Sequence, residues 1–326
     1  MTRIQKIKTI LMGTPEFAER IFRIIYPELK SRGFEIIAVV TTQDKPVGRK
    51  QILAPSPVKK WAIENNLLVL QPDKIRKTEW IEKIKELNPE LIILIAYGQI
   101  IPQEILDIPK YKALNIHPSL LPYYRGASPI QSVILNGEKE TGICLMIMDA
   151  EMDHGPIIGN SKFEIRNSKI TYKELSNQLT DLGADLLIST LPDYVDGKIK
   201  PQPQNHSKAT FCKLIKKEDG KIDWNKSAEE IERQIRAFAE WPTAYAEIPN
   251  PKSQIPNNLK ILNAETLNQK TDKKIGEVFL TDTKELAVQT GNGIMILKQV
   301  QPEGKKPMSA KDFLNGHPEI IGTILR

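Results

Sequence analysis

The chain of 326 residues is poor in cysteine, with only Cys144 and Cys212, far apart in the sequence. The two cysteines do not form the CxxC pair that many zinc and redox sites contain. Two distant thiols do not make a disulfide framework either. The sequence therefore indicates neither a disulfide-stapled fold nor a cysteine-based zinc site, and we expect no metal.

Long hydrophobic runs are also missing. The longest apolar stretches, such as residues 91–96, have the length of a β-strand and are too short to span a bilayer. The first residues carry basic side chains before a very short apolar stretch, unlike a secretory signal, whose apolar core has about 7 to 15 residues. We therefore expect a cytoplasmic protein. The sequence GxGxxG is absent as well, so the fingerprint of a dinucleotide-binding fold is missing.

The bulk composition is that of an ordinary globular protein, with 40% hydrophobic and 26% charged residues. The length favours two domains. The net charge is +6, and residues 1–60 hold 12 Lys and Arg against 5 Asp and Glu. This local surplus fits either an exposed surface of mixed sign or a basic approach for phosphate groups.

Continuous apolar strands alternate with helical patterns in the first hundred residues. Strands are predicted at 8–12, 34–41, 67–70 and 91–96, and helices at 15–29, 57–65 and 78–87. Such alternation favours a parallel sheet covered on both faces, an α/β fold of the doubly wound, Rossmann-like class. Ligands of this class bind beyond the carboxyl ends of the strands.

The pattern changes after about residue 200. A Pro-rich polar segment at 198–207 reads as a linker, and a helix with an N-terminal capping box is predicted at 227–239. Short β patterns follow at 244–248, 259–264, 276–281, 285–290 and 293–300, the last two joined by a Gly-Asn-Gly turn. We therefore expect two domains, at 1–206 and 207–326, the second a small open β-barrel.

Three polar residues are candidates for chemistry. Asn115 and His117 are two positions apart in a predicted strand, so their side chains point to the same face. Asp153 follows a second predicted buried strand. Each residue alone has a structural explanation, because a lone histidine is more often structural than catalytic and an aspartate can cap a turn. Together they bring a hydrogen-bond donor, an imidazole and a carboxylate within reach of one site.

The string NIHPSLLPYYRGASPIQ from Asn115, followed by Asp153, resembles the active-site signature of the 10-formyltetrahydrofolate-dependent formyltransferases. MGTPEFA near the start, the PSPVK segment, AYG, KIDW, RAFAEWP and QPEGKKPMSA extend the resemblance over essentially the whole chain. It implies that Asn115, His117 and Asp153 are catalytic and that the second domain is OB-like and binds tRNA. His154 stands where Thr is frequent in the family.

The sequence does not assign one role to each of these residues. Asn115 is suited to donate a hydrogen bond to a developing oxyanion, and His117 to bind that oxygen or move a proton. Asp153 is suited to orient the imidazole, tune it, or hold a water. The turn made of Ser119, Leu120, Leu121 and Pro122 is suited to the flat pteridine ring of the folate. Arg125 either fixes the loop or serves the substrate.

A basic loop at 42–57 carries Lys45, Arg49 and Lys50 among Gly and Pro residues. By itself it is either an exposed loop or a mobile contact for an RNA backbone. The resemblance favours RNA, because the family members that act on charged tRNA carry such an insertion. Further lysines between 208 and 226, interleaved with Phe211 and Trp224, fit the same partner or a solvated segment equally well.

The implied activity is transfer of a formyl group from 10-formyltetrahydrofolate to the α-amino group of initiator methionyl-tRNA, for translation initiation, by a monomer. The alternatives are a formyltransferase acting on a small amine, such as an amino sugar or glycinamide ribonucleotide, and a non-catalytic tRNA-binding protein. The presumed RNA-binding domain counts against the ribonucleotide, and the intact Asn, His and Asp set counts against a purely binding role.

Overall fold

The computed structural model describes residues 6–48, 51–249 and 257–326. The chain forms two compact units that are interleaved in sequence. The first unit comprises Met1–Pro129, Glu140–Glu164 and Ser176–Cys212, and the second comprises Ile130–Lys139, Ile165–Leu175 and Lys213–Arg326. None of the described helices is both long enough and apolar enough to cross a membrane.

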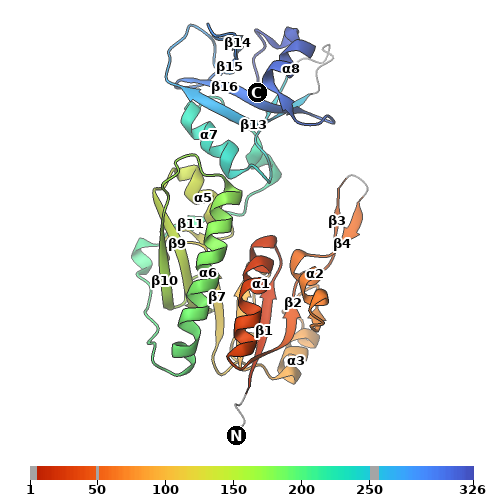
Figure 1. Ribbon diagram of the computed structural model, residues 1–326, viewed down its shortest axis with the longest axis vertical. Helices are drawn as coiled ribbons and strands as arrows, with labels where there is room; N and C mark the ends of the chain where they lie inside the picture. The colour runs from red at the N-terminus through yellow and green to blue at the C-terminus, as the bar shows by residue number, and fades with distance from the viewer. Residues whose placement is uncertain (1–5, 49–50, 250–256) are drawn as a thin grey trace. The chain divides into compact units, whose positions relative to one another are not determined.

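The first unit is built on a seven-stranded sheet with the strand order β10-β9-β7-β6-β1-β2-β5 (Figure 1). Five of its strands are parallel, as the sequence predicted, and β9 and β10 add an antiparallel edge that it did not. The strands are β1 (Ile7–Gly13), β2 (Phe34–Val40), β5 (Val69–Leu70), β6 (Leu91–Ile95), β7 (Ala113–His117), β9 (Glu140–Ile147) and β10 (Ile157–Glu164).

Helices cover both faces of this sheet. On one face, α1 (Glu16–Ser31) and α6 (Tyr172–Val195) meet over β7 and β9, where an added Cβ at Gly183 would touch Ile116, Ile21 and Ile143. On the other face, α3 (Thr78–Leu87) and α4 (Gln103–Leu106) close a core that includes Ala113 of β7. Asn115 and His117 alternate with Ile116 along β7, so they share this second face with Ala113. The predicted doubly wound class is confirmed.

Two elements of the first unit differ from expectation. The segment 42–57, expected to be a loop, contains the two-stranded hairpin β3 (Lys45–Val47) and β4 (Ile52–Ala54), followed by α2 (Pro57–Glu64). In this antiparallel hairpin Lys45 pairs with Ala54 and Val47 pairs with Ile52. The short strand β8 (Arg125–Gly126) pairs in parallel with β11 (Phe211–Cys212), which places the end of the first unit beside the Arg125 loop.

The second unit contains an antiparallel sheet with the strand order β12-β13-β16-β15-β14 and β17 paired to β16 (Figure 1). All five predicted strands are present, as β12 (Tyr245–Glu247), β13 (Asn258–Leu267), β14 (Val278–Leu280), β15 (Leu286–Gln289) and β16 (Ile294–Pro302), with the short β17 (Met308–Ser309) in addition. This unit contains the helices α7 (Ala228–Ala237) and α8 (Ala310–Gly316). It also contains α5 (Pro129–Asn136), except for Pro129, which belongs to the first unit. Helix α7 begins at Ser227 in the predicted capping box with Glu230.

Candidate active site

Strand β7 carries Asn115 and His117 at the centre of the sheet. Asn115 pairs with Leu94 of β6 on one side and with Met146 of β9 on the other. Both side chains are buried, with Asn115 6% and His117 4% exposed. Because the strand fixes them on one face, the predicted common orientation of the amide and the imidazole is present in the structure.

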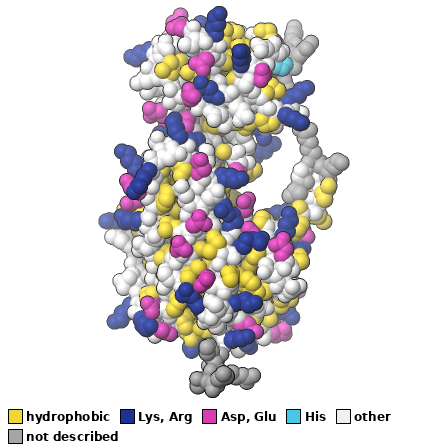
Figure 2. All heavy atoms as spheres, viewed as in Figure 1, with side chains coloured by type: hydrophobic (Ala, Val, Ile, Leu, Met, Phe, Trp, Pro, Cys, Tyr) yellow, Lys and Arg dark blue, Asp and Glu magenta, His cyan; other side chains and the backbone are white. Residues whose placement is uncertain are grey.

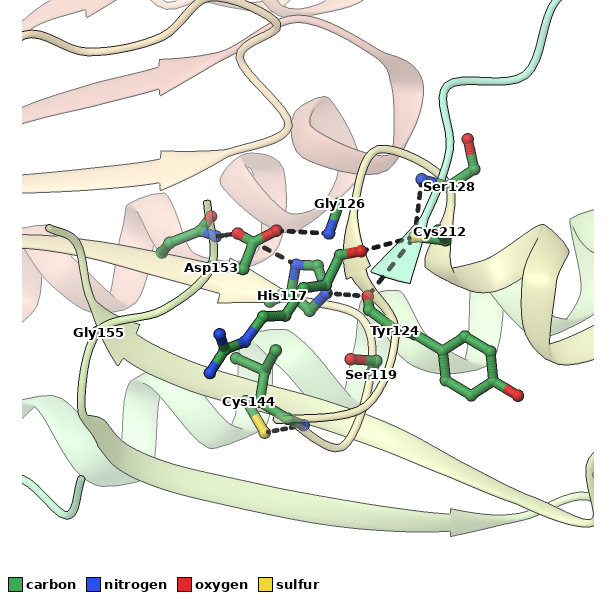
Figure 3. A network of polar contacts seen from close by, with 12 residues as sticks. His117, Ser119, Tyr124, Gly126, Ser128, Cys144, Asp153, Gly155 and Cys212 are labelled. Atoms are coloured by element: carbon green, nitrogen blue, oxygen red, sulfur yellow. Dashed lines mark hydrogen bonds and ion pairs between the residues drawn. The ribbon is translucent and has the colours of Figure 1, made fainter. Parts of the chain in front are cut away.

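Asp153 lies in the loop between β9 and β10, and its carboxylate joins the two strand residues (Figure 3). Asn115 Nδ2 donates to Asp153 Oδ1 at 3.3 Å, and His117 Nδ1 lies 3.6 Å from the same oxygen. The other oxygen, Oδ2, accepts from the backbone N–H of Gly126 at 2.8 Å. The structure therefore brings the three candidate residues together around one carboxylate.

The backbone around this carboxylate is tightly constrained. Asp153 has a φ of +49°, in the left-handed region that needs support from its surroundings. Gly155 permits the loop to close, because a Cβ there would lie 1.9 Å from the carbonyl oxygen of Ile147. Gly126, with a φ of +114°, likewise has no room for a Cβ against Cys212 O. These two glycines allow close backbone approaches on either side of the bond between Gly126 N–H and Asp153.

His117 is fixed through its far nitrogen. Nε2 lies 2.9 Å from the carbonyl oxygen of Tyr124, which can only accept, so Nε2 carries a hydrogen (Figure 3). In the neutral imidazole, Nδ1 then has no hydrogen, and its lone pair is directed toward Asp153. A proton on Nδ1 would face the Asp153 carboxylate oxygen at 3.6 Å. Nδ1 is therefore the ring nitrogen of His117 at which a proton can be accepted.

The turn after His117 is held from within. Ser119 is fully buried, and its hydroxyl donates to the carbonyl oxygen of Tyr123 at 2.6 Å. Leu121 packs on Cys144 and Met146, and its N–H donates to the Cys144 sulfur at 3.2 Å. Leu120 and Pro122 are half-buried. Ser119 and Leu121 thus shape the turn, whereas Leu120 and Pro122 have accessible surface.

Arg125 fixes loops, which was one of its two expected roles. It is 3% exposed, and its Nε and Nη2 both donate to Gln204 Oε1, at 3.2 and 2.6 Å. Gln204 Nε2 in turn donates to the carbonyl oxygens of Asp153 and Gly155, at 2.9 and 2.7 Å. Gln204 lies in the segment expected to be a linker, and the structure instead buries it in the first unit.

Sequence reasoning missed Gln204 and both thiols as parts of this site. A glutamine between Pro203 and Asn205 carries no pattern, and its partners are about 50 and 80 positions away in the chain. Burial raises the pKa of the Cys144 thiol to about 12, so this thiol stays protonated at neutral pH. The Cys212 sulfur lies 3.2 Å from the carbonyl oxygen of Arg125 and 3.4 Å from the N–H of Ser128 (Figure 3). Both thiols are packing groups of the site.

The predicted RNA-contacting residues are only partly described. Lys45 is exposed on β3 and lines a cavity of about 430 Å³ together with Lys74, Arg76 and the 98–100 segment. Arg49 and Lys50 lie outside the described residues. On the face shown in Figure 2, the Lys and Arg side chains of the described residues are mixed with Asp and Glu side chains.

The lysines of residues 208–226 have mixed surroundings. Lys213 pairs with Asp219 at 2.6 Å, and Lys221 pairs with Glu247 at 2.6 Å. Phe211 is 70% exposed, whereas Trp224 is 4% exposed and packs in the core of the second unit. Trp224 therefore belongs to the core of the second unit and offers no exposed ring for contact with RNA.

Comparison with known proteins agrees with these features over nearly the whole chain. Residues 5–191 match the family model described as formyl transferase, and residues 214–318 match that of the formyl transferase C-terminal domain. The chain is 40% identical to a methionyl-tRNA formyltransferase of Sulfurihydrogenibium sp. over 95% of this chain and 97% of the relative. It is 39% identical to that of Bacillus subtilis over 100% of this chain and 98% of the relative.

Solved structures share the fold at low sequence identity. HypX from Aquifex aeolicus, in complex with tetrahydrofolic acid, matches with a TM-score of 0.62 and 18% identity over 97% of this chain. This chain spans about half of HypX, 48% of its length. An N-formyltransferase from Helicobacter canadensis matches with a TM-score of 0.61 and 22% identity, over 89% of this chain and 99% of that protein. On the two family models and the near-full-length relatives together, this chain belongs to the formyl transferase family.

Proposed function

We propose that this chain transfers the formyl group of 10-formyltetrahydrofolate to the α-amino group of initiator methionyl-tRNA, giving N-formylmethionyl-tRNA for translation initiation. The convergence of Asn115, His117 and the Asp153 carboxylate, at 3.3 and 3.6 Å, carries the chemical part of this proposal. The names of the relatives, which are similar over nearly their entire length, support charged tRNA as the acceptor.

The residues present fit a folate. A flat heteroaromatic ring needs apolar surface together with backbone polar groups that contact its edge. Ile100, 83% exposed, follows β6 at its carboxyl end, and Leu120 and Pro122 keep accessible surface on the turn after β7. Leu120 and Pro122 contact the folate in this proposal, while Ser119 and Leu121 hold the turn in shape.

The reaction needs little beyond what these residues supply. Transfer forms a bond between the amine nitrogen and the formyl carbon and breaks the bond from that carbon to the donor nitrogen. An α-amino group titrates near about 7.7, so a large fraction is neutral at working pH and no strong base is required. The second N–H of Asn115 donates to the formyl oxygen as negative charge develops on it.

His117 manages the protons. Its Nδ1 takes the proton that the amine loses, because Nε2 is already engaged with Tyr124 O, and Asp153 stabilises the resulting charge. The same proton then goes to the donor nitrogen as its bond to carbon breaks. Asp153 acts through charge in this scheme, while Gly126 N–H and Asn115 fix its position.

RNA binding is divided between two regions in this proposal. Lys45, Arg49 and Lys50 contact the RNA backbone near the active site, supported by the exposed position of Lys45 beside Lys74 and Arg76. Residues 207–326 form the tRNA-binding domain, and residues 1–206 the catalytic domain. The enzyme acts as a monomer in this proposal. Charged tRNA is cytoplasmic, which supports the same location for the enzyme.

The test is a formyl-transfer assay that offers charged initiator tRNA, charged elongator tRNA and small amines, including an amino sugar and glycinamide ribonucleotide, side by side. We expect transfer to the initiator tRNA above all others. His117→Ala should lower turnover about 100- to 10,000-fold while tRNA affinity stays nearly unchanged. Preferential transfer to a small amine would replace the proposed acceptor, and full turnover by His117→Ala would remove this residue from the mechanism.

A further inference from the structure

Two of the four histidines form a stack beside Asp153 that the mechanism above does not use. The rings of His154 and His206 are 3.9 Å apart between centroids, with an angle of 8° between their planes. His154 directly follows Asp153, and His206 lies two residues after Gln204, which binds the backbone of Asp153. The stack therefore connects the Asp153 loop to the segment that supports it.

The contacts of His206 fix its protonation state. Its Nδ1 lies 2.8 Å from Nη2 of the buried Arg125. A guanidinium group can only donate hydrogen bonds, so Nδ1 must accept. His206 then carries its single hydrogen on Nε2 and is neutral, because a second hydrogen on Nδ1 would point at the Arg125 N–H.

The contacts of His154 are of the opposite kind. Its Nδ1 lies 2.7 Å from Asp149 Oδ2, and because an ionised carboxylate can only accept, Nδ1 carries a hydrogen. Asp149 is itself oriented by the N–H of Glu151, which donates to Oδ1 at 3.1 Å. The Glu151 carboxylate lies 4.0 Å from His154 Nε2. His154 thus faces two carboxylates and the flat face of a neutral ring, whereas His206 faces a cation.

This pattern can hold His154 in place whether or not it carries a second proton. In the neutral form the Nδ1–H bond to Asp149 and the stack remain. In the charged form, the ring gains attraction from both carboxylates and from the π face of His206. The ring is therefore clamped at its edge by Asp149 and on its face by His206.

The clamp acts on the backbone on both sides of His154. Gln204 binds the carbonyl oxygens of Asp153 and Gly155, at 2.9 and 2.7 Å, so the residues before and after His154 are tied to the same segment as His206. Arg125 binds both Gln204 and His206. Asp153 itself has a left-handed backbone that needs such support.

We propose that His154 is a positioning residue for Asp153: it fixes the 149–155 loop to the 204–206 segment by stacking on a neutral His206 and donating to Asp149. The effect on transfer rests on the proposed function, whereas the effect on Asp153 does not. Loss of the clamp should lower turnover more than substrate affinity, because the position of the carboxylate matters for the reaction and no substrate contact is removed.

Four variants separate the contributions. His154→Thr removes the ring and its donor to Asp149, and His154→Phe keeps a stacking ring without that donor. Asp149→Asn removes the acceptor's charge and provides a second route if a His154 variant fails to fold. His317→Phe is the matched control, because His317 contacts Phe313 in the second unit, with ring centroids 5.1 Å apart, and has no link to Asp153.

The kinetic experiment measures kcat and KM for both substrates after folding has been checked by circular dichroism. We expect kcat to fall about 10- to 100-fold in His154→Thr, less in His154→Phe and Asp149→Asn, and not in His317→Phe, with each KM within about twofold of wild type. An unchanged kcat in His154→Thr, or a loss confined to KM, would overturn the proposal.

A second readout needs no substrate. Nitrogen NMR of the wild-type histidines should show His206 with its hydrogen on Nε2 and His154 with a hydrogen on Nδ1. The side-chain carboxyl carbon of Asp153 should shift in His154→Thr and stay in place in His317→Phe. A hydrogen on His206 Nδ1, or an Asp153 signal indifferent to His154→Thr, refutes the clamp. Failure of the proposed function would instead appear as no transfer by the wild type with these signals as expected.

Discussion

At the scale of single residues, the two carboxylate oxygens of Asp153 contact different groups. Its Oδ2 accepts from Gly126 N–H at 2.8 Å, and its Oδ1 lies 3.6 Å from His117 Nδ1. Asp153→Asn can keep an oxygen toward Gly126, but its amide would then point at His117 and donate to Nδ1. That nitrogen could no longer take a proton, so we expect turnover to fall about 100- to 10,000-fold with the fold intact.

Single-turnover transfer by wild type and Asp153→Asn tests this expectation. The matched control is Asp149→Asn, which makes the same chemical change four positions earlier and should have a smaller effect. If the two variants lose activity equally, the direct role of the Asp153 charge at His117 is wrong.

Cys144 gives a second residue-scale prediction, through pH. Burial raises the pKa of its thiol to about 12, above the ordinary value of 9.0. The folded state therefore disfavours the thiolate, and the stability that Cys144 contributes is present below pH 9 and is lost as the pH rises toward 12. Between pH 8 and pH 10 this loss should be about 1.4 kcal/mol.

The measurement is urea unfolding of wild type and Cys144→Ala at both pH values. Other groups titrate in this range, so the difference between the two proteins is the relevant quantity. The variant should be less stable than wild type at pH 8, and the gap should shrink at pH 10. A constant gap would show that Cys144 does not titrate with the raised pKa.

The sequence predicts the orientation of a side chain where the regular alternation of a β-strand fixes it. Asn115 and His117 were placed on one face because strand residues alternate, and the structure has them so. Asp153 was placed nearby because it follows a neighbouring buried strand. The role of Gln204 could not be predicted from the sequence, because its position depends on Arg125 and the Asp153 loop, which only folding brings together.

At the scale of elements, the β3–β4 hairpin is the most testable. Its Lys45, together with Arg49 and Lys50, is proposed to contact RNA phosphates. Replacing all three with Ala should raise the KM for charged tRNA and leave folate affinity unchanged. The log–log dependence of tRNA affinity on salt should flatten by about 0.7 to 0.9 for each phosphate that the variant no longer neutralises.

A salt titration of tRNA binding by wild type and the triple variant decides this point. The control variant replaces Lys83, Lys85 and Lys110 with Ala. These three exposed lysines lie outside the proposed site. If the triple variant and the control give the wild-type slope, the hairpin is only exposed and the tRNA is held elsewhere.

Elements with strong local signals were predicted, and those without them were missed. The capping box of Ser227 and Glu230 marked the start of α7 correctly. Helix α6 was not predicted, because Gly183 and Pro192 interrupt its pattern. Gly183 has a packing reason, since a Cβ there would lie 3.2 Å from Ile116 Cγ2 of β7.

At the scale of the whole molecule, sequence order and compact units do not coincide. Two short stretches, Ile130–Lys139 and Ile165–Leu175, belong to the second unit although they precede the end of the first. Arg233 Nε on α7 donates to Leu135 O at 2.9 Å, and Arg236 Nη1 donates to Ile170 O at 2.7 Å. The sequence predicts one boundary near residue 206, because the composition changes there. Composition along the chain does not reveal that two earlier stretches pack with the second unit.

Arg236 is therefore expected to stabilise the second unit across distant parts of the chain. Besides Ile170 O, its Nε contacts both oxygens of Glu232, at 2.9 and 3.0 Å, and both side chains are nearly buried, 12% and 8% exposed. Arg236→Ala would leave the Glu232 carboxylate without its main partner and should cost about 3 kcal/mol of unfolding free energy.

Lys169 offers the matched control, because it contacts the same Glu232 at 3.1 Å from a side chain that is 59% exposed. Solvent screens that pair, so Lys169→Ala should cost about 0 to 1 kcal/mol. Urea unfolding of both variants, followed by circular dichroism and by tryptophan fluorescence, gives the two values. Equal costs would mean that burial does not decide the strength of these contacts. A loss confined to Arg236→Ala would show that this single side chain holds the 165–175 stretch to α7, because Lys169 shares its carboxylate but not its bond to Ile170 O.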